Sequence, residues 1–202
     1  MVTPMQDEKQ EHIRKILQAH TVGIAGAGGL GSNAAVSLAR SGVGHLIVVD
    51  FDIVEKSNLN RQYYFQEHIG KQKVIVLQEI IKKIDPSIAC TPIIQRLQPG
   101  SMASYFKDAD VIIEALDAAQ IKTQFVEEIQ KELPDKPLIA ASGVAGYGQM
   151  DRITTRKLGN LYVCYDPQAK SSDDDVLMAS KVSVMANWQA DLAIEILLGA
   201  SQ

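Results

Sequence analysis

The chain has few cysteines and lacks the cysteine pairs that bind zinc. Its two cysteines, Cys90 and Cys164, lie far apart in the sequence, and neither belongs to a C-x-x-C motif. The sequence therefore predicts no structural zinc site and no disulfide-rich scaffold, although a single disulfide between the two cysteines stays open.

Long apolar runs and an excess of basic residues are absent as well. No stretch of 18 apolar residues occurs, and the first residues, MVTPMQDEKQEHIRK, contain no apolar core of a secretion signal. These absences predict no membrane span and a cytoplasmic location. The net charge is −4 and the pI about 5.6, so electrostatics gives no reason to expect a nucleic-acid partner.

What is present is typical of a globular α/β protein. Of the 202 residues, 46% are hydrophobic and 22% are charged, which allows a sizeable core. Short apolar runs alternate with helical patterns, without repeats or a linker. This alternation predicts a single domain over residues 1–202 with a Rossmann-like, mostly parallel sheet and helices on both faces.

The same patterns predict the individual elements. A helix is expected within residues 1–20, and further helices follow the first, second and fourth strands. Toward the C-terminus we expect weaker, partly antiparallel strands at 146–165, a crossover loop at about 166–179 and a long apolar helix at 181–198. The main strands are predicted at residues 22–27, 46–50, 88–95, 111–116 and 138–142.

The segment Gly26-Ala27-Gly28-Gly29-Leu30-Gly31 follows a predicted strand and opens a predicted helix. Glycines let a backbone approach phosphate oxygens, and a helix N-terminus offers free N–H groups to them. Asp50 ends the second strand, 19 residues beyond Gly31, where a carboxylate can bind ribose hydroxyls. These features predict a nucleotide site. In the alternative interpretation, the glycines only permit close packing of the helix on the strand.

Three charged residues favour ATP over NAD. ATP carries about four negative charges and its sites recruit Lys, Arg and a divalent cation, whereas backbone amides can satisfy the pyrophosphate of NAD. Arg61 follows the second strand, Lys73 starts the next helix, and Asp117 closes the fourth strand. Parallel strands share one carboxyl edge, so we expect these residues to converge with Gly28 and Asp50. We find no hydride-transfer site and no Tyr-x-x-x-Lys pair.

Each of the three residues also has a purely structural interpretation. Arg61 would then be a surface arginine, Lys73 a solvated helix residue, and Asp117 the N-cap of the helix that follows it. Their combined spacing favours the functional interpretation.

Four segments resemble the ThiF/MoeB/HesA family of E1-like adenylyltransferases, which are relatives of ubiquitin-activating enzymes. They are Gly-Ala-Gly-Gly-Leu-Gly-Ser, Asp-Phe-Asp, Ser-Asn-Leu-Asn-Arg-Gln and Gly-x-x-Lys. The resemblance covers about residues 20–200, and residues 141–148 resemble the short ThiF branch in particular. It implies an enzyme that uses ATP and Mg²⁺, and a homodimer.

The resemblance also implies roles for individual residues. Asp50 binds the ribose, Asn58 and Arg61 hold the triphosphate, Lys73 contacts phosphate, and Asp117 serves Mg²⁺. With the glycine loop, the predicted site comprises Arg61, Lys73 and Asp117 as catalytic residues and Gly26, Gly28, Gly29, Gly31, Asp50, Asp52, Asn58 and Gln62 as nucleotide-binding residues.

The chain departs from longer family members in two ways. Those members carry two C-x-x-C pairs that bind structural zinc, and this chain has none. They also begin with an Arg-rich segment that completes the active site of the neighbouring subunit, and Arg14 matches that segment poorly. Whether an arginine acts in trans here stays open.

The predicted reaction is adenylation of the C-terminal glycine carboxylate of a small ubiquitin-like sulfur-carrier protein that ends in Gly-Gly, with thiamine biosynthesis as the family-based pathway. Related alternatives are activation of a molybdopterin carrier, of threonylcarbamoyladenosine in tRNA, or of a protein tag, although the chain has no catalytic-cysteine domain. An NAD-dependent oxidoreductase and a regulatory nucleotide-binding subunit are the more distant alternatives.

Two further features carry weaker hypotheses. Cys164 is a candidate for a covalent bond to the activated carrier, but we favour a packing role, because free cysteines usually behave as small apolar residues. The acidic stretch 171–175 is most simply a solvated loop, with a flap over the carrier's tail as the functional alternative.

Overall fold

The computed structural model describes residues 4–170 and 174–199. Within these ranges a seven-stranded sheet has the order β3-β2-β1-β4-β5-β7-β6. Neighbouring strands are parallel except β6, which pairs antiparallel with β7. The predicted fold class, including antiparallel pairing near the C-terminus, is confirmed.

The order of elements follows the predicted alternation closely. The predicted strands at 22–27 and 111–116 end earlier than expected, because the chain turns at Gly26 (φ +99°) and after Glu114. The elements are α1 (Pro4–Leu17), β1 (Thr21–Ala25), α2 (Gly29–Ser41), β2 (His45–Asp50), η1 (Lys56–Asn58), η2 (Gln66–His68), α3 (Lys73–Ile84), β3 (Ala89–Ile94), η3 (Ala103–Phe106), β4 (Val111–Glu114), α4 (Ala119–Glu132), β5 (Leu138–Ser142), η4 (Met150–Arg152), β6 (Thr154–Leu158), β7 (Leu161–Tyr165) and α5 (Ala179–Leu197).

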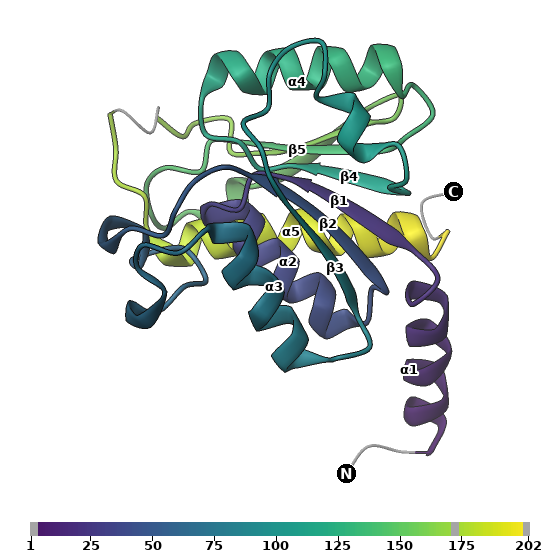
Figure 1. The fold of residues 1–202 in the computed structure, drawn as a ribbon. Coiled ribbons are helices and arrows are strands. Elements are labelled where there is room, and N and C mark those ends of the chain that lie inside the picture. The colour runs from purple at the N-terminus through teal and green to yellow at the C-terminus, as the bar shows by residue number, and fades with distance from the viewer. Residues whose placement is uncertain (1–3, 171–173, 200–202) are drawn as a thin grey trace.

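Helices cover both faces of the sheet (Figure 1). Helices α2, α3 and α5 pack on one face, and α4 with η3 packs on the other. The central strands β1, β2 and β4 are buried on both faces, which explains why they read as continuous apolar runs. Phe106 of η3 and Phe125 of α4 meet edge to face, with ring centroids 5.5 Å apart, at the centre of the second layer.

Helix α1 extends away from the sheet at the edge where the strands begin (Figure 1). Leu17 is its buried anchor, and Arg14 forms an ion pair with Asp85 at the end of α3. Arg14 therefore lies at the amino edge, on the side opposite the carboxyl ends of the strands. No helix in the described parts of the chain combines the length and the apolar character needed to cross a bilayer.

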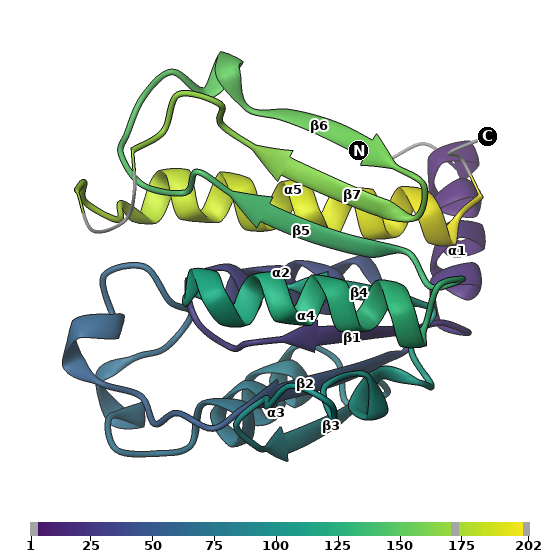
Figure 2. The same ribbon diagram turned by 90° about the horizontal axis from the view of Figure 1, so that it is seen from above.

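Strands β4 and β5 separate near their carboxyl ends (Figure 2). They pair only at Ile112↔Leu138 and Ile113↔Ile139. Gln189 of α5 donates from Nε2 to the carbonyl oxygens of Glu114 (2.9 Å) and Ile139 (3.1 Å). This buried amide bridges one carbonyl group from each strand at the point where their pairing ends. The separation opens the carboxyl edge of the sheet.

Candidate active site

A cavity of about 890 Å³ lies at this carboxyl edge. Its size falls within the range of small-molecule sites. Two predicted site residues, Gly31 and Asn58, do not line it. The predicted residues that do line it are Gly26, Gly28, Gly29, Asp50, Asp52, Arg61, Gln62, Lys73 and Asp117.

The glycines of the loop divide into two kinds. A Cβ atom at Gly31 would lie 1.8 Å from the Gly26 carbonyl oxygen, and one at Gly26 would lie 2.6 Å from the Ala115 carbonyl oxygen. Gly31 therefore serves packing, as in the structural interpretation. A Cβ atom at Gly28 would have the Gln62 side chain, 3.7 Å away, as its nearest neighbour. Gly28 caps the start of α2 and leaves its first N–H groups facing the cavity.

Asp50 holds the two turns that flank it. Its Oδ2 accepts the Ala27 N–H at 2.6 Å and its Oδ1 accepts the Asp52 N–H at 2.7 Å. Burial raises the pKa of Asp50 above its ordinary value, while these N–H groups and the charge of Lys73 oppose the rise. A carboxylate has about four acceptor sites, so the two bonds leave capacity for ribose hydroxyls.

Lys73 is buried, not solvated, so its structural interpretation was wrong. Its side chain is 7% exposed, and its Nζ donates to Oδ2 of Asp52 at 2.9 Å. Lys73 also begins α3 and donates its backbone N–H to the Asp52 carbonyl oxygen. The half-exposed Asp52 thus holds a desolvated ammonium group against the cavity wall.

Arg61 reaches the cavity from a loop that is fixed to α2. Asn33 donates from Nδ2 to the carbonyl oxygens of Gly29 (2.7 Å) and Arg61 (3.0 Å). Ser32 donates to the Gly28 carbonyl oxygen and accepts the Tyr63 N–H. The glycine loop and the arginine loop are therefore one hydrogen-bonded unit. Sequence reasoning missed this role of Ser32 and Asn33, which follow the glycine loop directly.

Asn58 has a structural place in the same loop. It is 9% exposed, and its Oδ1 accepts the Glu55 N–H at 3.0 Å. Its proposed contact with a triphosphate stays a prediction, since it does not line the cavity. Gln62 does line it, and its Oε1 is buried without a hydrogen-bond partner among the described residues.

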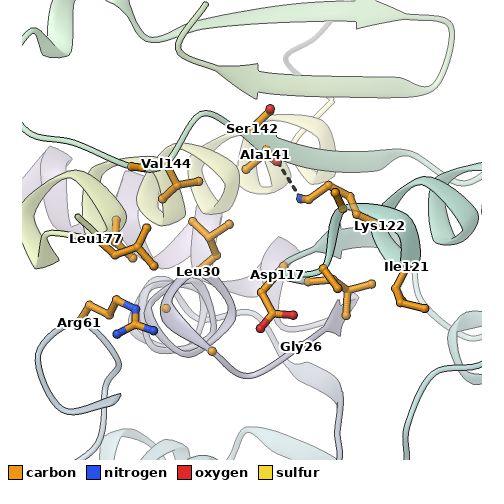
Figure 3. Close-up of a pocket in the computed structure, with 18 of the residues that line it drawn as sticks. Gly26, Leu30, Arg61, Asp117, Ile121, Lys122, Ala141, Ser142, Val144 and Leu177 are labelled. Carbon is orange, nitrogen blue, oxygen red and sulfur yellow. Dashed lines mark hydrogen bonds between the residues drawn. The ribbon is translucent and has the colours of Figure 1, made fainter. Parts of the chain in front are cut away.

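Asp117 lies three residues beyond the end of β4, not at its last residue. Helix α4 begins after Ala118 without a side-chain cap, so the N-cap interpretation of Asp117 is also wrong. Figure 3 shows the Asp117 carboxylate and the Arg61 guanidinium extending from opposite sides into the same space beside Gly26. This arrangement leaves the carboxylate available to a ligand.

Lys122 and Glu114 form a second charged pair that sequence reasoning missed. Glu114 is fully buried and pairs with Lys122, which also donates to the Ala141 carbonyl oxygen at 2.8 Å (Figure 3). Glu114 accepts the Leu116 N–H at 2.7 Å and so shapes the turn before Asp117. Burial raises the pKa of Glu114, although Lys122 opposes the rise. A glutamate within an apolar strand was the signal that could have revealed it.

The rim of the cavity carries further residues outside the prediction. The Arg96 guanidinium stacks on the Phe51 ring, 3.6 Å from its centroid, which is a cation–π contact. Asp166 and Lys170 come from the start of the predicted crossover loop and line the opposite side.

Cys164 is fully buried in β7. Burial raises the pKa of its thiol to about 11, so the packing role is the one that the structure favours. In the acidic stretch 171–175, residues 171–173 lie outside the described residues, and the flap hypothesis concerns them.

The chemistry of the site suits Mg²⁺ better than a protein-bound transition metal. Among the described residues, no group of three or more His, Cys, Asp or Glu side chains is placed to hold a metal. Mg²⁺ usually binds one or two carboxylates together with phosphates and water. A cavity that presents Asp117 beside a helix N-terminus and two cations fits that pattern.

The sheet order, the glycine loop and the cavity at the carboxyl edge define an α/β protein of Rossmann-like architecture. Comparison with known proteins gives the family. The profile of the ThiF family matches residues 2–202, and the chain belongs to that family.

Two relatives illustrate the similarity. The chain is 31% identical over 189 residues to the adenylyltransferase and sulfurtransferase UBA4 of Yarrowia lipolytica, which covers 91% of this chain and 47% of that protein. It is 29% identical over 196 residues to the molybdopterin-synthase adenylyltransferase of Escherichia coli, with 92% and 76% covered. The chain thus spans less than half of the fungal relative.

Solved structures share the fold. The E. coli tRNA N6-threonylcarbamoyladenosine dehydratase TcdA, in complex with ATP, has a TM-score of 0.86 at 18% identity and covers 100% of this chain and 98% of its own. E. coli MccB with ATP has a TM-score of 0.75 at 25% identity and covers 94% of this chain and 59% of its own.

Proposed function

We propose that this protein uses ATP to adenylate the C-terminal carboxylate of a small ubiquitin-like sulfur-carrier protein and releases pyrophosphate. One observation carries the proposal. Arg61, Lys73 and Asp117 come from three separate segments, yet all line one cavity beside the N-terminus of α2. Two cations and one acid that faces the cavity suit a triphosphate with its metal.

The reaction needs no general base. A C-terminal carboxyl group has a pKa of about 3.3–3.7, so it is ionised at pH 7. One of its oxygens attacks the α-phosphorus of ATP, a new P–O bond forms, and the bond to pyrophosphate breaks. The products are an acyl-adenylate and pyrophosphate, and no proton transfer is required.

The main barrier is the approach of one anion to another. Arg61 and Lys73 lower this repulsion and stabilise the charge that builds up on the leaving pyrophosphate. Lys73 is suited to the task because Asp52 fixes it before ligand binding, so it needs little reorganisation. Mg²⁺, held by Asp117 together with phosphate oxygens, would supply additional positive charge when bound.

The part of the cavity that is lined by the end of β5, the turn after it and the residues after β7 suits a slender, flexible chain. Small residues line it, including Ala141, Ser142, Gly143, Ala145 and Ala169. Glycine needs no side-chain space, so a Gly-Gly end fits such a wall. We propose that the carrier's tail enters here, with ATP on the glycine-loop side.

The identity of the carrier protein is proposed from similarities in sequence. The resemblance of residues 141–148 to the short ThiF branch supports a carrier of thiamine biosynthesis. The similarity to the E. coli molybdopterin-synthase adenylyltransferase and to UBA4 supports sulfur-carrier activation in general. We further propose that the chain is one domain, acts as a homodimer in the cytoplasm and needs no nucleic acid.

Pyrophosphate exchange tests the proposal. The purified protein is incubated with ATP, Mg²⁺ and radioactive pyrophosphate, together with each of several carriers that end in Gly-Gly. Exchange should require a carrier, and the same carrier without its last glycine should be inactive. Arg61→Ala and Asp117→Ala should each lower exchange by ~100-fold or more. Tight binding of NAD with no affinity for ATP and Mg²⁺ would refute the proposal.

A further inference from the structure

The cavity wall on the tail side contains a charged pair for which the proposed chemistry has no use. Lys181 Nζ lies 2.7 Å from Oδ2 of Asp166, and the two side chains are 4% and 3% exposed. Lys181 also donates to the Ala145 carbonyl oxygen at 2.8 Å. Both side chains are thus withdrawn from water, and their charges neutralise each other.

These contacts join three segments that are far apart in the sequence. Asp166 directly follows β7, Lys181 lies in the first turn of α5, and Ala145 belongs to the turn after β5. The Asp166 Oδ1 also accepts the Gln168 N–H at 3.0 Å. One ammonium group and one carboxylate therefore fix both described ends of the 166–179 segment against residues 143–146.

The backbone packing at this point is tight. A Cβ atom at Gly143 would lie 2.6 Å from the Asp166 carbonyl oxygen. Gly146 donates its N–H to the Val176 carbonyl oxygen at 2.8 Å and forms a parallel bridge with Leu177. Asp166, Ala145 and Leu177 all line the cavity, so a shift in any of these contacts changes the shape of its tail side.

A buried ion pair is a poor source of stability. Its desolvation penalty offsets much of the attraction, and a well-packed apolar pair is often as stable. Positional specificity is a better reason for the pair. Burial alone would raise the pKa of Asp166, but the hydrogen bonds from Lys181 and Gln168, together with the charges of Lys181 and Arg152, outweigh burial and lower that pKa. Asp166 is therefore an anion whose charge Lys181 cancels.

From this geometry we propose that Lys181 and Asp166 are positioning residues for the carboxylate substrate, and that they shape and neutralise the tail side of the cavity without acting on ATP. The inference rests on the proposed function. An uncompensated Asp166 would repel an incoming carboxylate, and an untethered Ala145 would loosen the wall. Among the described residues, no hydrogen bond or ion pair joins Arg61, Lys73 or Asp52 to this pair.

Steady-state exchange kinetics separate the two sides. In Lys181→Met, the KM for a Gly-Gly carrier should rise by about 10- to 100-fold, the scale of a misplacement of about 1 Å. The KM for ATP should stay within about twofold of the wild-type value, because the substitution removes no contact to ATP. The double variant Lys181→Met/Asp166→Asn removes the charge repulsion between residue 166 and the carrier's carboxylate, but it does not restore the hydrogen bond to Ala145. Its KM for the carrier should therefore lie between those of Lys181→Met and the wild type.

Two controls keep the test sharp. Lys181→Arg retains the charge and should recover most of the carrier affinity, and Lys131→Met removes an exposed lysine on α4 and should change nothing. If Lys181→Met does not fold, the neutral double variant serves in its place. Equal increases in both KM values, or none in either, would overturn the inference.

Hydrogen exchange makes the result independent of the carrier. Amides of residues 143–146 and 166–170 should exchange faster in Lys181→Met, while ATP affinity measured by calorimetry stays unchanged. If the wild type shows no carrier-dependent pyrophosphate exchange, the proposed function fails. The hydrogen-exchange rates of these amides still test whether Lys181 fixes the cavity wall. Unchanged protection in both segments would reject it.

Discussion

Two alanine substitutions in the glycine loop should have opposite signatures. At Gly31 the new Cβ atom would lie 1.8 Å from the Gly26 carbonyl oxygen, below the 3.0 Å that such contacts keep, so the start of α2 must move by roughly 1.2 Å. At Gly28 the nearest atom is 3.7 Å away, so the methyl group fits but projects toward the cavity.

The magnitudes follow from these distances. Overpacking of this kind costs about 1–3 kcal/mol, and each kcal/mol lowers the Tm of a chain of this size by about 2–4 °C. Gly31→Ala should therefore melt roughly 2–12 °C below the wild type. Gly28→Ala should melt within a few degrees of the wild type but lose a charge-assisted contact to phosphate, worth about 1.5–3 kcal/mol, so its Kd for ATP should rise by ~10- to 100-fold.

Thermal unfolding and calorimetric titration with ATP and Mg²⁺ measure both effects on the same samples. Gly70→Ala is a useful control for backbone strain, because Gly70 has φ +86° with no atom within 4 Å of its Cβ position. A wild-type Tm for Gly31→Ala would refute the packing argument. Wild-type ATP affinity in Gly28→Ala would refute the assignment of the loop to phosphate.

Three further changes test other contacts. Lys73→Met should lower pyrophosphate exchange by ~100-fold with little loss of stability, because the partner Asp52 stays half-exposed to water; loss of folding without ATP, seen by circular dichroism, would contradict this. Lys122→Met leaves Glu114 buried without its cation and should cost about 3–5 kcal/mol at pH 7. Because the pKa of Glu114 is raised in the folded state, the free energy of unfolding falls as pH rises above its ordinary 4.5. Urea unfolding of the variant should therefore show a loss of stability that grows above pH 4.5, and a loss that does not depend on pH would refute the role of the Glu114 charge. Cys164→Ser should retain carrier-dependent exchange, since the thiol is buried and its pKa is about 11; loss of exchange in a folded variant would revive the covalent role.

Much of the fold could be predicted because its signals are local. The runs that became β1, β2 and β4 are apolar on both faces, and that pattern is typical of central parallel strands. The glycine loop and Asp50 were predictable because strand, turn and helix follow one another within a short segment. Element ends were less certain, since they depend on single dihedral angles such as that of Gly26.

Contacts between side chains from separate elements could not be predicted from the sequence. Lys122 and Glu114 are eight residues apart and Lys181 and Asp166 fifteen. No motif marks either pair, and the one available signal, a glutamate within an apolar strand, indicates Glu114 but not its partner. Burial of Lys73 was also unpredictable, because lysine is usually exposed and only the fold brings Asp52 next to it. The sequence could name residues that meet at the strand ends, but it could not say which of them hold one another.

The buried Glu114–Lys122 pair has a physical cause in the sheet. Strands β4 and β5 pair at only two positions and separate beyond them, so backbone carbonyl groups at this edge need partners outside the two strands. Gln189 takes those of Glu114 and Ile139, and Lys122 takes that of Ala141. An open sheet edge therefore needs long polar side chains that donate hydrogen bonds to these carbonyl groups. When the donor is an ammonium group, as in Lys122, a nearby acid such as Glu114 must balance its charge. On this reasoning, the buried Glu114–Lys122 pair is a consequence of opening the cavity, and substituting either residue should change the shape of the cavity before it changes the chemistry.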